Sequence, residues 1–369
     1  MGSEVMPIKV GVVGCGVISG IYFQNLTRFE AVEVVACSDL DPAMSAAVVK
    51  NYPSIKAMTT KELLADESID LIVNLTQPQY HFDVMKAGIV SGKHVYGEKP
   101  LCVSYEDSVE LQRLAITHRV RVGCAPDTFL GAGIQTCRRL IDEGAIGTPI
   151  GATAFFTTPG HERWHPSPEF YYKVGGGPML DMGPYYLTAL VNLLGPAKFV
   201  SGSARITYPQ RTITSEPKIG TKINVEIPTH VTGTVDFVSG VIATVITSFD
   251  VWGAQLPFIE VYGSEGSLSV PNPNNFGDPV KILTRDREEW LEVPYDRPFS
   301  ENSRGLGVAD MAASISKGEP HRANGTLASH VLEILHAFTR SSDSGLRIEL
   351  DSSCERPDPL PVDSLMYRQ

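Results

Sequence analysis

The sequence lacks the features of secreted, membrane-bound and disulfide-stabilised proteins. Its six cysteines are scattered and include no Cys-x-x-Cys pair, which is typical of small buried residues in a reducing compartment, and no metal site is predicted. No apolar run approaches the roughly 18 residues of a membrane-spanning helix. The N-terminal residues show neither the basic region nor the apolar core of a secretion signal. These absences predict a cytoplasmic protein with no membrane partner.

An excess of basic residues is also missing. The 369 residues include 31 Lys and Arg against 42 Asp and Glu, a net charge of −11. Nothing in this balance would gather phosphates on a basic face, so we expect no nucleic-acid partner. Apolar residues, in contrast, make up 43% of a chain that is longer than one typical domain. We therefore predict two domains with sizeable cores.

A glycine turn near the N-terminus predicts the first half of a dinucleotide-binding unit. The apolar run from Ile8 to Val13 is typical of a buried parallel strand, and a helical pattern follows from Val17 to Phe29. Between them, Gly14 permits a tight turn and Gly16 lets the backbone approach a pyrophosphate. Ser19, a small residue, takes the place of the third glycine. The amides and the dipole at the helix start would then face the phosphates.

An acidic residue follows at the expected distance. Asp39 ends the next apolar run and stands 23 residues after Gly16, close to the spacing of about 20 for the carboxylate that binds the adenosine ribose. An acid there repels a 2′-phosphate, so the sequence favours NAD, with NADP possible. The alternative is that Asp39 only begins the turn at Asp41 and Pro42.

Strand and helix patterns alternate through the first third of the chain and then change. This rhythm predicts a doubly wound parallel α/β sheet in residues 1–127. Strands then follow one another without helices, and Ser239-Gly240 can make a tight turn between two of them. We predict an α+β domain with an open, mainly antiparallel sheet in residues 128–369. The predicted strands of the two parts are 8–13, 33–38, 70–75, 94–97 and 120–123, and then 152–158, 200–207, 231–238, 241–249, 258–262, 267–270 and 346–350.

Three motifs give the chain a resemblance to a known family. Gly14-Cys15-Gly16, the stretch Gly-Glu-Lys-Pro at 97–100 and the glycine-rich stretch at 175–183 resemble the Gfo/Idh/MocA oxidoreductases. The resemblance runs from Ile8 to about Leu350. It implies a Rossmann domain followed by an open-faced α+β domain that binds substrate and often mediates oligomers. A homodimer or homotetramer is therefore expected.

The same motifs indicate where a nicotinamide would lie. Ligands of open α/β sheets bind beyond the carboxyl ends of the strands, where Lys99 is found. A lysine there can bond a substrate hydroxyl and stabilise alkoxide character, although most lysines are simply solvated. The resemblance suggests that the bond between Lys99 and Pro100 is cis, and it places His81 near the cofactor; His81 could equally begin a helix. The predicted cofactor-binding residues are Gly14, Cys15, Gly16, Val17, Ile18, Asp39, Leu75, Thr76, Gln77, His81, Glu98 and Lys99.

The sequence offers more than one candidate for the proton-transfer residue. Many family members have Asp, three residues and then His, and this chain has Asp181 followed by Tyr185. Our hypothesis is that Tyr185 replaces the histidine, with its pKa lowered by a cation such as Lys99. His165, in a loop rich in aromatic residues, is the competing candidate, and Tyr185 could instead only line the pocket. The predicted catalytic residues are thus Lys99, Asp181, Tyr185 and His165.

The loop at 160–166 and the residues after the last Rossmann strand complete the expected substrate site. Trp164 could stack on a sugar ring, and histidines could bond its hydroxyls. The alternatives are an ordinary loop with one buried Trp, and for Asp127 a turn between the domains. The predicted substrate-binding residues are Lys99, Asp127, His161, Trp164, His165, Asp181 and Tyr185.

These residues favour one of three functions. The first is an NAD(P)-dependent oxidoreductase that transfers a hydride between nicotinamide and a secondary alcohol of a sugar, cyclitol or related polyol. The second keeps NAD tightly bound and uses it transiently for glycoside cleavage, elimination or epimerisation. The third is a non-catalytic regulator that binds the dinucleotide, against which Lys99 and Asp181 both argue.

Overall fold

The computed structural model describes residues 6–362, 365 and 367, which form two compact units. The first unit holds the described residues within 1–130, 301–329 and 357–369, and the second holds 131–300 and 330–356. The chain therefore returns to its first unit after completing most of the second. This division differs from a single boundary after Asp127, because distant segments pack on the N-terminal sheet.

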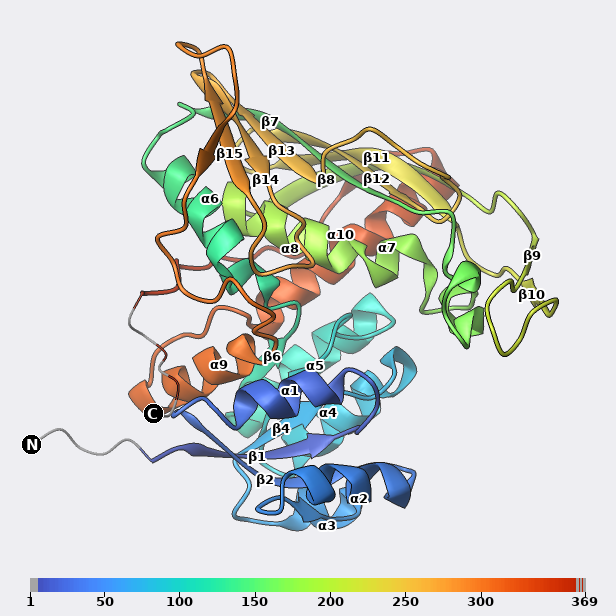
Figure 1. Cartoon of the computed structure of the whole chain (residues 1–369), viewed down its shortest axis with the longest axis vertical. Helices are drawn as coiled ribbons and strands as arrows, with labels where there is room; N and C mark the ends of the chain where they lie inside the picture. Colours follow the sequence, from blue (N-terminus) through green and yellow to red (C-terminus); the bar gives the residue numbers. More distant parts are fainter. Residues whose placement is uncertain (1–5, 363–364, 366, 368–369) are drawn as a thin grey trace, which may run out of the picture. The chain divides into compact units, whose positions relative to one another are not determined.

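The first unit contains a six-stranded parallel sheet, as the alternating pattern predicts (Figure 1). The strands are arranged in the order β3-β2-β1-β4-β5-β6. From β1 the chain first adds strands on one side of the sheet and then, from β4 onward, on the other side. A dinucleotide binds at such a switch point, beyond the carboxyl ends of the strands. The strands are β1 (Ile8–Val13), β2 (Val32–Ser38), β3 (Lys56–Ala57), β4 (Leu71–Asn74), β5 (His94–Gly97) and β6 (Val122–Cys124).

Local signals explain where several helices of this unit begin. The Thr59 side chain accepts a hydrogen bond from the amide of Glu62, whose carboxylate bonds back to Thr59 in a capping box. Ser104 likewise accepts from the amide of Asp107. The helices are α1 (Ser19–Leu26), α2 (Pro42–Asn51), α3 (Thr60–Ala65), α4 (His81–Val90), α5 (Tyr105–His118) and α9 (Leu306–Lys317), with short 3₁₀ turns η1 (Pro78–Tyr80) and η2 (Thr128–Leu130).

The second unit is built on a nine-stranded mixed sheet with the order β16-β15-β14-β13-β7-β12-β11-β8-β17. Among the described strands of this sheet only β7 and β12 pair in parallel, so the prediction of a mainly antiparallel sheet is confirmed. Gly240, at a φ of +88°, turns β11 into β12 as expected. The strands are β7 (Pro149–Thr157), β8 (Ala197–Arg205), β11 (His230–Phe237), β12 (Ile242–Ser248), β13 (Ile259–Gly263), β14 (Gly266–Val270), β15 (Val280–Thr284), β16 (Leu291–Val293) and β17 (Ile348–Glu349), with β9 (Gln210–Thr212) and β10 (Lys222–Asn224) pairing separately.

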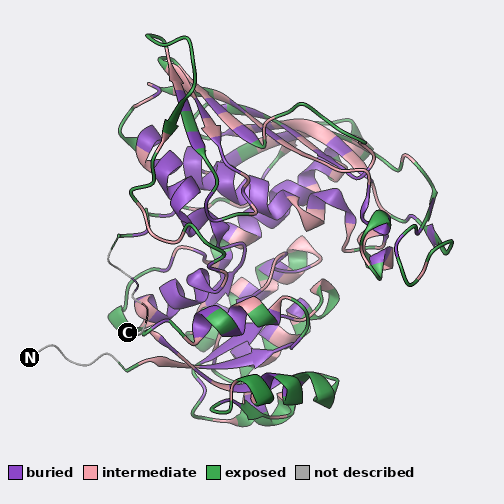
Figure 2. Ribbon diagram, in the orientation of Figure 1, coloured by how far each residue is buried: buried purple, intermediate pink, exposed green. Residues whose placement is uncertain are grey.

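Helices cover one face of this sheet and leave the other without a described helix (Figure 1). The covering helices are α6 (Ala132–Asp142), α7 (Gly177–Asp181), α8 (Gly183–Leu194) and α10 (Gly325–Ser344). They are largely buried, as Figure 2 shows. The contact is close: a Cβ at Gly202 would lie 2.7 Å from the carbonyl oxygen of Phe338 in α10. Within the described residues, the helices are too short or too polar for any of them to cross a bilayer.

Candidate active site

The turn after β1 is held against the loop after β4 by a glycine. Gly14 has a φ of +99°, and a Cβ there would lie 2.7 Å from the carbonyl carbon of Leu75. Its amide also donates to the carbonyl oxygen of Ser38 at 2.8 Å. A side chain would therefore be strained and would push two loops apart, so Gly14 sets the shape of the switch point.

Gly16 faces open space instead. No heavy atom lies within 4 Å of the position that a Cβ would take there. The next residue, Val17, is fully exposed, and the Ser19 hydroxyl donates to the Gly16 carbonyl oxygen at 2.7 Å to shape the start of α1. The backbone before this helix start is thus uncovered, which is what the approach of a pyrophosphate requires. This geometry fits a dinucleotide.

Asp39 fixes the glycine loop through both of its carboxylate oxygens. One accepts a hydrogen bond from the amide of Cys15 at 2.7 Å, and the other accepts from the amide of Asp41 at 2.9 Å. The side chain therefore acts as a turn residue. Each carboxylate oxygen can accept a further bond, so this role is compatible with the predicted contact to a ribose.

His81 joins the two loops that flank the expected nicotinamide position. Its ring is fully buried, with Nδ1 at 2.7 Å from the carbonyl oxygen of Pro100 and Nε2 at 3.0 Å from that of Thr76. Burial lowers the pKa of His81, and the two carbonyl bonds oppose that effect. The side-chain oxygen Oδ1 of buried Asn74 stabilises the same loop by accepting a hydrogen bond from the Thr76 hydroxyl at 2.7 Å. His81 thus positions backbone, and its direct contact with a cofactor stays a prediction.

The loop after β5 holds Lys99 in a defined backbone conformation. The Glu98 carboxylate accepts from the Tyr22 hydroxyl of α1 at 2.8 Å and from the Lys99 amide at 3.0 Å. The bond between Lys99 and Pro100 is cis, which confirms that prediction. Tyr22 therefore connects the helix of the glycine motif to the lysine loop.

The Asp127 side chain bonds backbone amides of a segment that is distant in sequence but belongs to the same unit. The side chain is buried, and its Oδ2 accepts from the amides of Gly305 and Gly307 at 2.8 and 3.0 Å, where α9 begins. Burial raises the pKa of Asp127 to about 6, against the opposing effect of these bonds. The observed role is to cap α9. Its predicted contact with substrate stays a prediction.

A histidine–aspartate pair lies in the second unit. Nε2 of His161, in the turn η3 (His161–Arg163), is 3.0 Å from Oδ2 of Asp181 at the end of α7. Both side chains are mostly buried, at 9% and 15% exposure. Sequence reasoning named both residues but did not pair them. They are 20 positions apart in irregular chain, where no periodicity relates two side chains.

Aromatic rings enclose the imidazole of His161. Tyr171 and Phe249 have ring centroids 4.2 and 4.5 Å from it, and Trp164 lies at 5.2 Å. Nδ1 of His161 is buried and has no hydrogen-bond partner among the described residues. A protonated ring would therefore bury an unpaired N–H, whereas a neutral ring with its proton on Nε2 leaves only a lone pair there.

The two predicted proton-transfer residues lie in different settings. His165 is half-buried, and its Nδ1 accepts from the amide of Ser167 at 3.0 Å, so a neutral ring carries its proton on Nε2. Burial also lowers the pKa of His165. Tyr185 is buried in the first turn of α8, and Asp181 ends α7, so they do not share one continuous helix. The role of each in proton transfer stays a prediction.

A buried ion cluster, which the sequence analysis missed, supports the turn that carries His161. The Arg211 guanidinium bonds Glu162 at 2.7 Å and also contacts Asp250, while the Tyr172 hydroxyl donates to Glu162. The four side chains come from β9, the β7–α7 loop and the residues just after β12. No sequence signal links such positions, because the fold alone brings them together.

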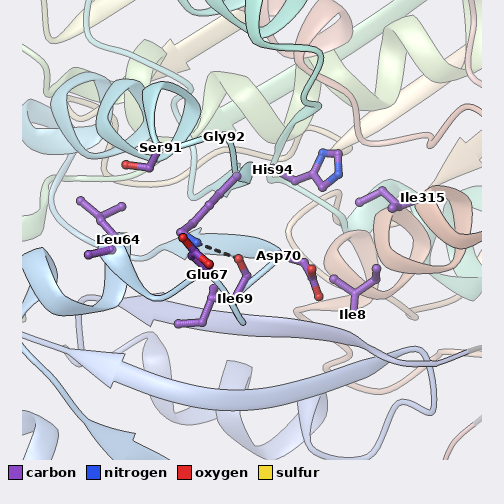
Figure 3. Close-up of a pocket in the computed structure, with 11 residues that line it drawn as sticks. Ile8, Leu64, Glu67, Ile69, Asp70, Ser91, Gly92, His94 and Ile315 are labelled. Atoms are coloured by element: carbon purple, nitrogen blue, oxygen red, sulfur yellow. Dashed lines mark hydrogen bonds between the residues drawn. The ribbon is translucent and has the colours of Figure 1, made fainter.

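One cavity in the first unit lies at the wrong edge of the sheet for a dinucleotide. It measures about 530 Å³, and its lining includes Ile8, Asp70 and His94, at or just before the starts of β1, β4 and β5 (Figure 3). The buried Lys93 ammonium there donates to two backbone carbonyls at 2.6 and 2.8 Å. Because nucleotides bind at the opposite, carboxyl ends, we do not assign this cavity to the cofactor.

Comparison with known proteins covers both units. Residues 8–125 match the family model described as "Oxidoreductase family, NAD-binding Rossmann fold", and residues 134–269 match the "GFO/IDH/MocA C-terminal domain". A 1,5-anhydro-D-fructose reductase of Ensifer adhaerens is 30% identical over 78% of this chain and 82% of its own length. An inositol 2-dehydrogenase of Ralstonia nicotianae is 28% identical over 56% of this chain and 59% of its own. The chain spans about half the length of an uncharacterized oxidoreductase of Schizosaccharomyces pombe, at 27% identity over 51% of this chain and 52% of that protein.

Solved structures share the fold. An NAD-binding oxidoreductase from Klebsiella pneumoniae superposes with a TM-score of 0.79 at 20% identity, covering 93% of this chain and 99% of that one. Levoglucosan dehydrogenase in complex with NADH and L-sorbose gives a TM-score of 0.80 at 18% identity, over 94% of this chain and all of the other. At these identities the likeness establishes the architecture of the two units.

Proposed function

Because this chain belongs to the Gfo/Idh/MocA family of NAD-binding oxidoreductases, we propose that it oxidises or reduces a sugar, cyclitol or related polyol. The reaction moves a hydride between a secondary alcohol carbon and nicotinamide. The observation that carries the proposal is the lysine loop at the carboxyl end of β5, held by Glu98 and Tyr22. Relatives named as an anhydrosugar reductase, an inositol dehydrogenase and a D-xylose dehydrogenase support this substrate class.

The first unit would hold the cofactor. Gly14 and Gly16 leave room for the pyrophosphate, and Asp39 presents a carboxylate to the ribose hydroxyls, which favours NAD over NADP. When bound, the nicotinamide supplies the hydride acceptor or donor. Thr76 and Glu98 belong to loops at the same carboxyl edge of the sheet, and we assign them to its nicotinamide half.

The chain's own residues handle the substrate hydroxyl. The Lys99 ammonium hydrogen-bonds the oxygen and stabilises its negative charge as the carbonyl forms. We assign Asp181, Tyr185 and His165 of the second unit to substrate binding. Trp164 and His161, from the same loop as His165, are assigned to it as well. Of these, Asp181, Tyr185 and His165 are the candidates to receive the proton.

The proposed assembly is a homo-oligomer in the cytoplasm. Six cysteines without disulfides in the structure support a reducing compartment. The sheet face without a described helix supports self-association through the second unit. The substrate is a small molecule, and no nucleic-acid partner is proposed for a chain of net charge −11.

A substrate panel tests the proposal. Purified protein is incubated with NAD and single cyclitols, aldoses, ketoses and anhydrosugars, and NADH formation is followed by absorbance, with the reverse reaction run on the matching ketones. We expect turnover with at least one ring polyol. NAD binding in a calorimeter without any turnover across the panel, in either direction, would contradict it.

A further inference from the structure

We propose that His161 is a positioning residue for Asp181, and that this pair takes the place of the Asp-x-x-x-His pattern that Tyr185 interrupts. The inference rests on the proposed function and deepens it. It identifies Asp181 as the group that receives the proton of the substrate hydroxyl, and a loop histidine as the group that holds it ready.

The hydrogen bond at 3.0 Å is the first step of the argument. Asp181 is mostly withdrawn from water at 15% exposure, and a carboxylate in such a place is costly unless donors compensate it. An imidazole N–H supplies one such donor and fixes the orientation of the carboxylate. The ring is itself fixed by Tyr171 and Phe249, so it has little freedom to turn away.

The buried Nδ1 favours one tautomer of His161. Since this atom has no partner among the residues that the structure describes, a charged ring would leave an N–H unpaired. In its neutral form the ring therefore carries its proton on Nε2 and donates it to the carboxylate of Asp181. In the oxidative direction Asp181 takes the hydroxyl proton as the carbon–oxygen double bond forms, and NAD⁺, when bound, would accept the hydride. Asp181 later returns the proton to water.

The ion cluster keeps the turn in place. Arg211 bonds the carbonyl oxygen of Pro159 at 3.2 Å and the carboxylate of Glu162 at 2.7 Å, so residues on both sides of His161 are tied to one guanidinium. The His161 amide also donates to the Tyr172 hydroxyl at 3.1 Å. Hydrogen bonds on both sides of His161 thus fix the backbone of the turn, which keeps the ring in place beside Asp181.

His165 and Tyr185 are less suited than Asp181 to receive the proton, each for a different reason. Nδ1 of neutral His165 already accepts from a backbone amide, and Nε2 carries its proton, so the ring has no free lone pair for a further proton. Tyrosine is a weak base at neutral pH unless a cation acts on it. Neither limitation applies to an ionised carboxylate with a fixed donor.

Two substitutions at His161 separate positioning from packing. His161→Phe keeps a ring in the aromatic enclosure and removes the donor, while His161→Gln keeps an N–H donor on a side chain that does not titrate. We expect His161→Phe to lower kcat about 10- to 100-fold and to move the acid limb of the kcat/KM profile to higher pH. His161→Gln should recover most of kcat and the wild-type profile. The exposed His118→Gln is the matched control.

The results for these variants either support or overturn the role proposed for His161. Wild-type kcat and pH profile in His161→Phe, or a larger loss in Tyr185→Phe than in His161→Phe, would overturn the proposal. If His161→Phe does not fold, His161→Gln decides alone: activity as low as that of Asp181→Asn would overturn it, and near-native activity would support it.

A second measurement does not depend on turnover. ¹⁵N NMR of the imidazole reports which ring nitrogen carries the proton, and we expect Nε2–H with bare Nδ1 near neutral pH. A charged ring or the Nδ1–H tautomer would overturn the pairing. The expected tautomer, together with no turnover on any polyol, would instead leave the pair standing and reject the proposed function.

Discussion

At the scale of single residues, Lys99 is the side chain on which the proposed reaction depends most. Lys99→Ala should lower kcat roughly 10²- to 10³-fold, because it removes the cation that stabilises the developing alkoxide. Its backbone is held by Glu98, so the loop should survive the change. Steady-state kinetics and NAD titration check this, with the exposed Lys61→Ala as control. Near-native kcat would remove Lys99 from the mechanism.

Asp39 tests cofactor choice. Asp39→Ala should weaken NAD more than NADP, because only NAD offers the ribose hydroxyl that the carboxylate would bond. The structure adds that Ala also removes the bond to the Cys15 amide, so some loss with both cofactors is expected. Asp39→Asn keeps one acceptor oxygen for the turn and serves as the matched variant. Tighter binding of NADP than of NAD by the wild type would reject the assignment.

Asp127 predicts a pH dependence of stability. Burial raises its pKa to about 6 in the folded protein, above an ordinary value of about 3.9 when unfolded. The folded state then binds more protons between these values, so the stability penalty of the buried charge is progressively relieved as pH falls from about 6 towards about 3.9. The difference between these two pKa values corresponds to roughly 3 kcal/mol of unfolding free energy.

The comparison with Asp127→Asn isolates this effect. Urea unfolding at several pH values should show wild type gaining stability relative to Asp127→Asn between about pH 7 and pH 4.5. Other titrating groups are common to both proteins and cancel in the difference. A difference that stays constant with pH would contradict the prediction.

At the scale of elements, the buried cluster should be far more important than exposed ion pairs. Arg211→Met leaves Glu162 and Asp250 buried without their cation and should cost about 3–5 kcal/mol of unfolding free energy. Arg285→Met, which breaks the exposed pair with Glu265, should cost about 1 kcal/mol or less. Chemical denaturation measures both. Equal, small losses would show that the cluster does not support the turn.

The elements also show how far sequence reasoning reached. The strands around Gly14, Gly16 and Lys99 were predicted because each motif is local, and its chemistry is fixed by a few adjacent residues. The pair formed by His161 and Asp181 was not predicted, because its partners meet only after an irregular loop folds back. The strands β15 and β16 were also missed, since short and partly exposed segments carry weak periodicity.

At the scale of the molecule, the order of segments along the chain does not reveal which segments belong to the first unit. Sequence reasoning assigned residues 128–369 to one domain, but 301–329 pack with the first unit, where the amides at the start of α9 bond Asp127. A single carboxylate buried 178 positions from its partner gives no local pattern. The two units are therefore connected more than once by the chain.

The sheet face without a described helix predicts how copies of the chain associate. Strand register pairs Thr244 with both Thr153 and Thr234, so these three residues share one face of the sheet. The adjacent residue Ala152 is buried on the other face, which the helices cover. A threonine-rich, half-exposed surface of neighbouring strands suits sheet-to-sheet contact between identical subunits.

Thr244→Arg should therefore lower the oligomeric mass measured by light scattering after size exclusion, because it places one charge from each subunit in the contact without altering the covered face. NAD binding by the first unit should persist. The exposed Thr117→Arg, on a helix of the first unit, is the control. A monomeric wild-type protein would reject self-association, and a Thr244→Arg variant of unchanged mass would place the contact on another surface.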